Sequence, residues 1–264
     1  MPESYLEINK EFWNSRVDGH VDSDFYDNKT FLEGRNSLNK IELPLLGDLK
    51  GKSVLHLQCH FGQDSISMAR MGARVTAVDF SEKAIATGKR LNEECGTKVE
   101  FVCADVYSLP EILQQEFDIV FTSYGTIGWL PVITKWANVV SKFTKSGGAF
   151  VMAEFHPFVW TFDEDLNEPT YSYFNDKPIV DDEEGSYANP ANGVKSKYMG
   201  WNHGLAEVIN ALKSANIQLE DFQEFDYSPY DVFPEMELRA EGEYILKKWP
   251  NLIPLVYSLR CTKG

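Results

Sequence analysis

Residues Val54 to Ser65 read VLHLQCHFGQDS, and this stretch decides how the rest of the chain is interpreted. The apolar segment Val54–Leu57 predicts a buried strand, and a helix is expected to follow from Asp64 to Met71. Nucleotide-binding α/β proteins usually place glycines between such a strand and helix, because a residue without a Cβ lets the backbone approach a ligand closely. In this chain the turn, here called the first turn, contains Gln58, Cys59, His60, Phe61 and Gly62.

Strand-like and helix-like segments alternate after the first turn. The expected strands are ARVTAVDF, ending at Asp79; KVEFVCADV, ending near Asp105; FDIVFTSYG; and AFVMAEF. Helices are expected from an N-cap at Ser81 through Leu91 and from Val132 to Phe143, with KSGG ending the second. This alternation predicts a mostly parallel, doubly wound Rossmann-like α/β sheet with helices on both faces.

The two ends of the chain follow different patterns. The segment before Leu49 mixes aromatic and polar residues and is expected to form irregular helices. Near the other end, a helix from Leu205 to Ala215 is followed by the strand-like segments IQLEDFQEF and LVYSLRCT, which suit an antiparallel edge pair. We expect a single domain with an N-terminal cap or lid (1–49), a cofactor-binding core (50–156), an insertion over a sheet edge (157–202) and a C-terminal helix and strand pair (203–264).

Composition excludes several classes of partner. The chain has 25 Lys and Arg against 40 Asp and Glu, a net charge of -15, which disfavours nucleic acid because phosphate backbones are also negative. Neither a signal peptide nor a membrane-spanning run is recognisable, so we expect a cytosolic protein without a membrane partner. The four cysteines lack paired CxxC spacing, so no metal site is expected.

Two acidic residues stand where strands are expected to end. In open parallel sheets ligands bind outside the carboxyl ends of the strands. Asp79, after the second strand, is suitably placed to accept hydrogen bonds from a ribose diol, although an acid before a helix can also be only a cap. Asp105, after the third strand, is placed to accept from an adenine amino group. Together with the first turn, these positions predict a nucleoside-containing ligand.

The successive segments VLHLQCHFGQDS, VTAVDFSEKAI, VCADV, FDIVFTSYG and KSGGAFVMAEF resemble the motifs of the class I S-adenosylmethionine-dependent methyltransferases over about Lys52 to Phe155. The segment WNHGLAEVINAL resembles a subset of bacterial small-molecule methyltransferases. The resemblance implies a seven-stranded sheet with an antiparallel last strand and S-adenosylmethionine as the cofactor. It implies cofactor contacts at Leu57, Gln58, Cys59, His60, Gly62, Asp79, Phe80, Ala104, Asp105, Val106, Ser123 and Tyr124. The sequence departs from the family where His56 replaces an acid and where Gln58 and His60 replace glycines.

Other residues are candidates for the acceptor side of such a site. Aromatic faces favour the positive charge of a sulfonium, and Trp13, Phe25, Tyr26 and Trp129 are candidates for a lid or substrate pocket, with packing in the core as the alternative. The fifth strand ends in AEFHPF, which places Glu154 and His156 on one face near the carboxyl edge. His156 is the candidate base or acceptor-orienting group, with Glu154 beside it. The alternative is that His156 only hydrogen-bonds a loop.

These patterns favour a methyltransferase that acts on a small-molecule acceptor, and two other functions stay open. A nicotinamide-dependent oxidoreductase shares the first two strand signals but needs the glycine fingerprint GxGxxG, which this chain lacks. A non-catalytic protein could keep the fold and the cofactor, because function depends on the site and not on the fold. The identity of the acceptor and the oligomeric state do not follow from these patterns.

Overall fold

The computed structural model describes residues 5–174, 177–190, 193 and 195–264. The chain divides into two compact units that are interleaved in the sequence. The first unit contains the chain up to Leu38, Asp48–Phe117 and Pro178–Gly200. The second contains Asn39–Gly47, Asp118–Lys177 and Trp201–Gly264. The expected single domain, with its boundaries at 49, 156 and 202, stays a prediction.

The strands form the sheet that the sequence predicts. Its seven strands follow the order β3-β2-β1-β4-β5-β11-β8. The strands β1, β2 and β3 pair in parallel, whereas β11, the last strand of the chain, pairs antiparallel with both β5 and β8. The predicted α/β fold with an antiparallel last strand is therefore confirmed.

The first unit holds the strands that precede the two candidate acids. Its elements are α1 (Tyr5–Val21), α2 (Asn28–Leu32), β1 (Ser53–Leu57), α4 (Gln63–Arg70), β2 (Arg74–Asp79), α5 (Glu82–Glu94), β3 (Glu100–Cys103), α6 (Leu109–Ile112), β6 (Ile179–Glu184) and β7 (Lys195–Gly200). All side chains from Val54 to Leu57 are buried, as expected for a strand covered on both faces. The predicted N-cap is confirmed, since the Ser81 hydroxyl accepts a hydrogen bond from the Ala84 amide at 3.0 Å.

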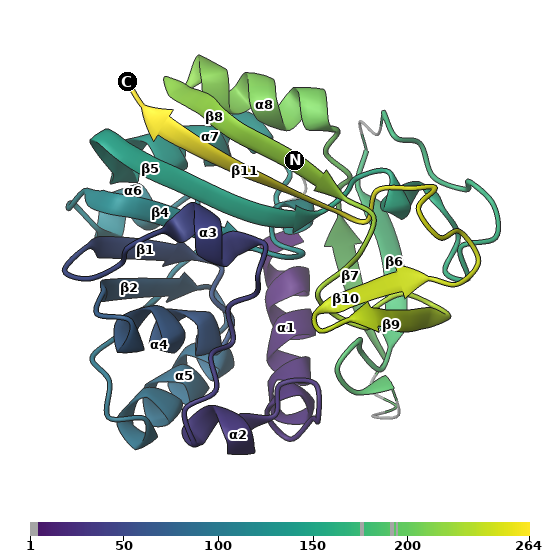
Figure 1. Cartoon of the computed structure of the whole chain (residues 1–264), viewed down its shortest axis with the longest axis horizontal. Helices are drawn as coiled ribbons and strands as arrows, with labels where there is room; N and C mark the ends of the chain where they lie inside the picture. Colours follow the sequence, from purple (N-terminus) through teal and green to yellow (C-terminus); the bar gives the residue numbers. More distant parts are fainter. Residues whose placement is uncertain (1–4, 175–176, 191–192, 194) are drawn as a thin grey trace. The chain divides into compact units, whose positions relative to one another are not determined.

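The N-terminal segment is more regular than expected. We expected irregular helices, but α1 is a continuous helix of 17 residues. Three of its five buried residues are polar: Asn9, Arg16 and His20. Helix α1 runs beside β7, as Figure 1 shows, and the Asn9 side chain makes two 2.8 Å hydrogen bonds with the backbone of Met199. A hairpin far along the sequence thus stabilises the N-terminal helix.

The second unit contains the remaining strands. Its elements are α3 (Glu42–Leu46), β4 (Phe117–Ser123), α7 (Ile133–Phe143), β5 (Thr144–Phe155), α8 (Leu205–Ser214), β8 (Ile217–Phe225), β9 (Met236–Ala240), β10 (Glu243–Leu246) and β11 (Val256–Lys263). Helices α7 and α8 pack side by side in Figure 1. Helix α7 ends at Phe143, just before KSGG, and β5 begins directly after it, so KSGG lies inside the strand, which starts earlier than the expected AFVMAEF. Along the described ranges, no helix combines the length and the apolar character needed to cross a bilayer.

Candidate functional site

The first turn keeps a backbone that normally requires glycine. Gln58 has a φ of 55°, His60 of 51° and Gly62 of 78°, so every second residue is left-handed. For a residue with a Cβ this region costs about 1–2 kcal/mol. The turn therefore has the shape of a glycine-rich nucleotide-binding turn, although only one of the three residues is glycine.

Glycine is indispensable at one of these positions. A Cβ on Gly62 would lie 2.6 Å from the ring of Phe101, closer than carbon atoms can approach. Gly62 also precedes α4, where its left-handed conformation starts the helix. Packing thus selects glycine at Gly62 and permits side chains at Gln58 and His60.

Asp79, at the end of β2, is held beside the first turn. One carboxylate oxygen accepts the Ser81 amide and the other accepts the His60 amide, each at 2.9 Å. The side chain is 7% exposed, and burial raises its pKa to about 6. Each carboxylate oxygen has a second lone pair, so the fixed group can still accept from a diol. The neighbouring site residues Leu57 and Cys59 are buried, and Phe80 is half-buried.

Asp105, at the end of the third strand region, caps the turn that leads to α6. Its Oδ2 accepts the amides of Tyr107 at 2.9 Å and Ser108 at 3.1 Å. The flanking residues Ala104 and Val106 are buried. Burial and the charge of Asp105 raise the pKa of Tyr5 to about 12, which places the start of α1 near this acid.

Helix α1 continues along the edge defined by these acids. Asn14 Oδ1 accepts the Ser81 hydroxyl at 2.6 Å, and Asn14 Nδ2 donates to Glu82 at 3.2 Å. An ion pair of 2.6 Å joins Lys83 to Asp18. The helix is thus fixed to the start of α5, directly after Asp79.

Aromatic rings and two histidines meet over the first turn. His20 Nδ1 lies 3.0 Å from His60 Nε2, and His20 Nε2 lies 3.0 Å from the Ser186 hydroxyl. Ring centroids of Trp13 and Tyr26 lie 5.5 and 5.6 Å from that of His60. Phe25 packs edge-on against Tyr26 at 5.1 Å. This cluster, here called the histidine cluster, contains Trp13, His20, Tyr26, His60, Phe61, Ser186 and Tyr187.

The remaining candidates belong to the second unit. Ser123 ends β4, and Tyr124 follows with a φ of 37° and donates its hydroxyl to Glu42 at 2.7 Å. Trp129 donates its indole N–H to the Gly125 carbonyl at 2.7 Å. These bonds shape the loop after β4.

Glu154 organises the same loop. Its buried carboxylate accepts the Thr126 amide at 2.8 Å, the Thr126 hydroxyl at 2.9 Å and the Ile127 amide at 3.2 Å. It also accepts the amides of Gly125 and Phe155. Five donors use all four lone-pair positions of a carboxylate. The catalytic role assigned to Glu154 stays a prediction, and these bonds leave it no lone pair for an acceptor.

His156 is tied to a different carboxylate from the one expected. Its Nε2 donates to Glu224 on β8 at 2.9 Å, and its Nδ1 accepts the Phe158 amide at 3.1 Å. Burial lowers the pKa of this imidazole, and the Glu224 charge opposes the shift. The geometry favours the alternative of a hydrogen-bonded loop, and the role as base stays a prediction.

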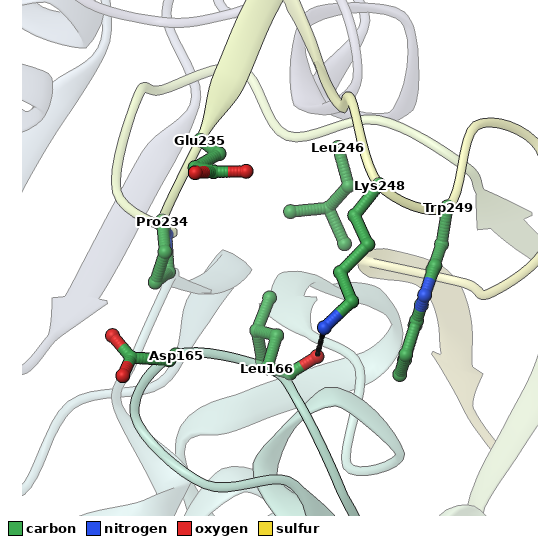
Figure 2. A pocket seen from close by; sticks show the side chains of 7 residues that line it. All are labelled: Asp165, Leu166, Pro234, Glu235, Leu246, Lys248 and Trp249. Atoms are coloured by element: carbon green, nitrogen blue, oxygen red, sulfur yellow. Dashed lines mark hydrogen bonds between the residues drawn. The ribbon is translucent and has the colours of Figure 1, made fainter.

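A shallow pocket lies elsewhere in the second unit, with an empty volume of about 240 Å³ that includes space open to solvent. Figure 2 shows its lining: Asp165, Leu166, Pro234, Glu235, Leu246, Lys248 and Trp249. Lys248 donates to the Leu166 carbonyl at 3.2 Å. No residue predicted from the sequence to form the site lines this pocket.

The region that contains the first turn and the two acids resembles known proteins. Residues 54–148 match the family model described as a methyltransferase domain. Over these residues the chain resembles a methyltransferase domain. The matched region starts at β1 and ends inside β5, so it includes the first turn, Asp79 and Asp105. The oxidoreductase alternative has no support from this family.

Curated relatives resemble the chain over about half of its length. A demethylmenaquinone methyltransferase from Beutenbergia cavernae is 32% identical over 118 residues, which cover 45% of this chain and 47% of the relative. A ubiquinone biosynthesis O-methyltransferase from Bordetella avium is 30% identical over 129 residues, 49% of this chain and 48% of the relative. The chain spans about half the length of these curated relatives.

Solved structures resemble the chain over more of its length. An S-adenosylmethionine-dependent methyltransferase from Mesorhizobium loti has a TM-score of 0.56 at 20% identity, covering 88% of this chain and 100% of that one. The structure of a DhpI–SAH complex has a TM-score of 0.58 at 14% identity, covering 100% and 99%. At these identities the likeness shows the shared fold.

Sequence reasoning missed His20, Ser186 and Tyr187. His20 lies seven residues after Trp13, which is two helical turns and hence the same face of α1. That spacing was available in the sequence. Ser186 and Tyr187 follow β6 in the chain, and nothing in their local sequence indicates that they lie in the histidine cluster.

Proposed function

We propose that this protein transfers a methyl group from S-adenosylmethionine to a small-molecule acceptor. The observation that carries the proposal is Asp79, a buried carboxylate held by two backbone amides beside a left-handed turn. A buried carboxylate with a raised pKa at the end of a strand is a candidate for a binding site. A ribose diol is a suitable partner, since it offers two hydroxyl donors to the two oxygens.

The described residues fit this cofactor. The first turn exposes a backbone of the kind that approaches a ligand closely, and Asp79 and Asp105 stand at consecutive strand ends. Asp79 would hold the ribose, Asp105 with Ala104 and Val106 the adenine, and the first turn the methionine portion. When bound, S-adenosylmethionine supplies an electrophilic methyl group on a sulfonium sulfur. The chain must then align an acceptor with that methyl, and alignment alone contributes several kcal/mol to such a displacement.

Helix α1 and the histidine cluster support a lid over this site. Tyr5 lies near Asp105, Asn14 bonds to Ser81 beside Asp79, and Trp13 packs on His60. The helix therefore passes all three parts of the proposed cofactor site in order. A lid of this kind excludes water and must move for the cofactor to enter.

A small acceptor in the cytoplasm agrees with the charge of the chain. The net charge of -15 opposes nucleic acid as acceptor. The relatives named for ubiquinone and demethylmenaquinone methylation match about half of the chain, so their acceptors carry over only as a class of small molecules.

Calorimetry with S-adenosylmethionine, S-adenosylhomocysteine, NAD and NADP tests the proposal, using Asp79→Ala as the site variant. A hydrogen bond to a charged group contributes about 1.5–3 kcal/mol, so the variant should bind S-adenosylhomocysteine about tenfold to a hundredfold more weakly. Glu93→Ala, at an exposed position on α5, is the matched control and should bind like the wild type. Failure of the wild type to bind either adenosyl ligand would overturn the proposal. Equal affinity of Asp79→Ala and wild type would remove Asp79 from the site.

A further inference from the structure

His20 connects the cap to the first turn. It lies in the last turn of α1, is fully buried, and has a partner at each ring nitrogen. One partner is His60 in the first turn and the other is Ser186 after β6, both at 3.0 Å. Three separate stretches of the first unit therefore meet at one imidazole.

The His60 backbone acts directly on Asp79. Its amide donates to Asp79 Oδ2 at 2.9 Å, and the residue is left-handed, with a φ of 51°. Such a conformation persists only where the surroundings hold it. Within the described residues, the side-chain hydrogen bond from His60 to His20 is one such restraint, and the packed rings of Trp13, Tyr26 and Phe61 are another.

The two histidines can form this bond only when one of the two facing ring nitrogens carries a proton and the other does not. A neutral imidazole has one N–H donor and one acceptor nitrogen, so the chain from Ser186 through His20 to His60 can run in either direction. Burial lowers the pKa of His20 to about 4 and also lowers that of His60, and the Arg16 charge acts in the same direction on His20. Both rings are thus neutral near pH 7 and can pair without repulsion.

We propose that His20 is a positioning residue for the cofactor, fixing His60 so that its backbone amide orients the Asp79 carboxylate toward the ribose. This inference rests on the proposed function. His20 itself touches neither the ribose nor the reacting atoms. Its effect on cofactor affinity should therefore depend on Asp79.

The test is a double-mutant cycle on S-adenosylhomocysteine binding, measured by calorimetry on folded protein. His20→Phe keeps a ring stacked near Tyr26 but cannot hydrogen-bond to His60. Loss of one hydrogen bond in the chain should weaken binding about tenfold. His20→Gln retains a hydrogen-bonding group and should stay within about threefold of the wild type. In the Asp79→Ala background, His20→Phe should change affinity by less than about twofold, because the carboxylate it positions is absent.

Two further measurements separate positioning from general stability. His203→Phe removes another buried histidine, in the second unit, and should lower stability while leaving the affinity unchanged. Nitrogen-15 spectra of histidine-labelled protein should show the His60 Nε2 resonance shifting in His20→Phe. If His20→Phe does not fold, Ser186→Ala, which frees only the far nitrogen of His20, should weaken binding about threefold.

The outcomes distinguish this inference from the proposed function. If the wild type does not bind S-adenosylhomocysteine, both the proposed function and the inference are overturned. If the wild type binds and His20→Phe binds equally well, only the inference is overturned. An equal loss of affinity with and without Asp79 also overturns it, because His20 would then act on the ligand by another route.

Discussion

Replacement of His56 tests the energetics of the sheet beneath the site. His56 lies in β1, is 2% exposed, and pairs through Nδ1 with the Ser65 hydroxyl at 2.7 Å. Burial lowers its pKa from 6.5 to about 3, because a charged imidazole is poorly solvated inside the sheet. A neutral imidazole is therefore the form that the folded chain favours at this position.

The lowered pKa of His56 decides whether acid stabilises or destabilises the folded chain. Between the two pKa values the unfolded chain binds a proton at His56 that the folded chain does not bind. The stability is therefore complete above the unfolded pKa of 6.5 and decreases as the pH falls toward 3. Each pH unit in this window removes about 1.4 kcal/mol, so acidification from about pH 7 to about pH 4.5 removes about 3 kcal/mol.

His56→Asn isolates this contribution, since an amide can still bond to Ser65 but does not titrate. Urea unfolding at the two pH values should show the variant losing about 3 kcal/mol less than the wild type on acidification. The cavity left by the smaller side chain lowers stability at both pH values and cancels in this difference. Asp79, whose pKa is raised to about 6, changes the stability in the opposite direction on acidification. Its contribution is the same in wild type and variant and therefore also cancels in this difference. Ser65→Ala, the control, should cost about 1 kcal/mol at both pH values. Equal acid sensitivity of wild type and His56→Asn would refute the reasoning.

Three more predictions concern the first turn, the loop after β4 and the lid. Gly62→Ala should cost about 2–4 kcal/mol in urea unfolding, because its Cβ would meet Phe101, whereas Gly51→Ala, with a similar φ and open space, should cost only about 1 kcal/mol. Glu154→Gln should lower the free energy of unfolding by about 3 kcal/mol, because an NH₂ group would face backbone donors. The control Glu224→Gln changes a half-exposed carboxylate and should lower it by less than about 1 kcal/mol. Equal losses in the two variants would contradict the anchoring role of Glu154. Limited proteolysis before Lys52 should slow when S-adenosylhomocysteine is added, and unchanged cutting would remove the reason to call α1 a lid.

The sequence predicted those parts of the fold in which burial and local pattern agree. The strands ending at Leu57 and Asp79 are apolar and follow short helices, so their parallel pairing and the position of Asp79 could be read directly. Ser81 was recognised as a cap because its hydroxyl acts within its own helix. These features depend on contacts close along the chain.

Features that depend on distant contacts could not be predicted. Helix α1 buries Asn9, Arg16 and His20. Their partners lie far along the sequence: the backbone of a strand for Asn9, a backbone carbonyl for Arg16 and a second imidazole for His20. A hydrophobic pattern does not detect a face of this kind. Strand periodicity placed Glu154 and His156 at the correct edge. It could not show that the Glu154 carboxylate accepts hydrogen bonds from the amides of a neighbouring loop, or that the His156 imidazole bonds to Glu224.

The first turn shows why glycine is kept at one position and lost at two others. All three residues, Gln58, His60 and Gly62, are left-handed, so backbone conformation alone would favour glycine at each. A side chain at Gly62 would also collide with the ring of Phe101, so either the turn or the ring would have to shift. At His60 the cost is only the strain of about 1–2 kcal/mol, which a hydrogen bond to His20 and contacts with three aromatic rings can offset. A glycine there would leave the amide that faces Asp79 held by the backbone alone. The departure from the glycine pattern is therefore consistent with a nucleotide-binding turn whose rigidity comes from a side chain instead of from its own backbone.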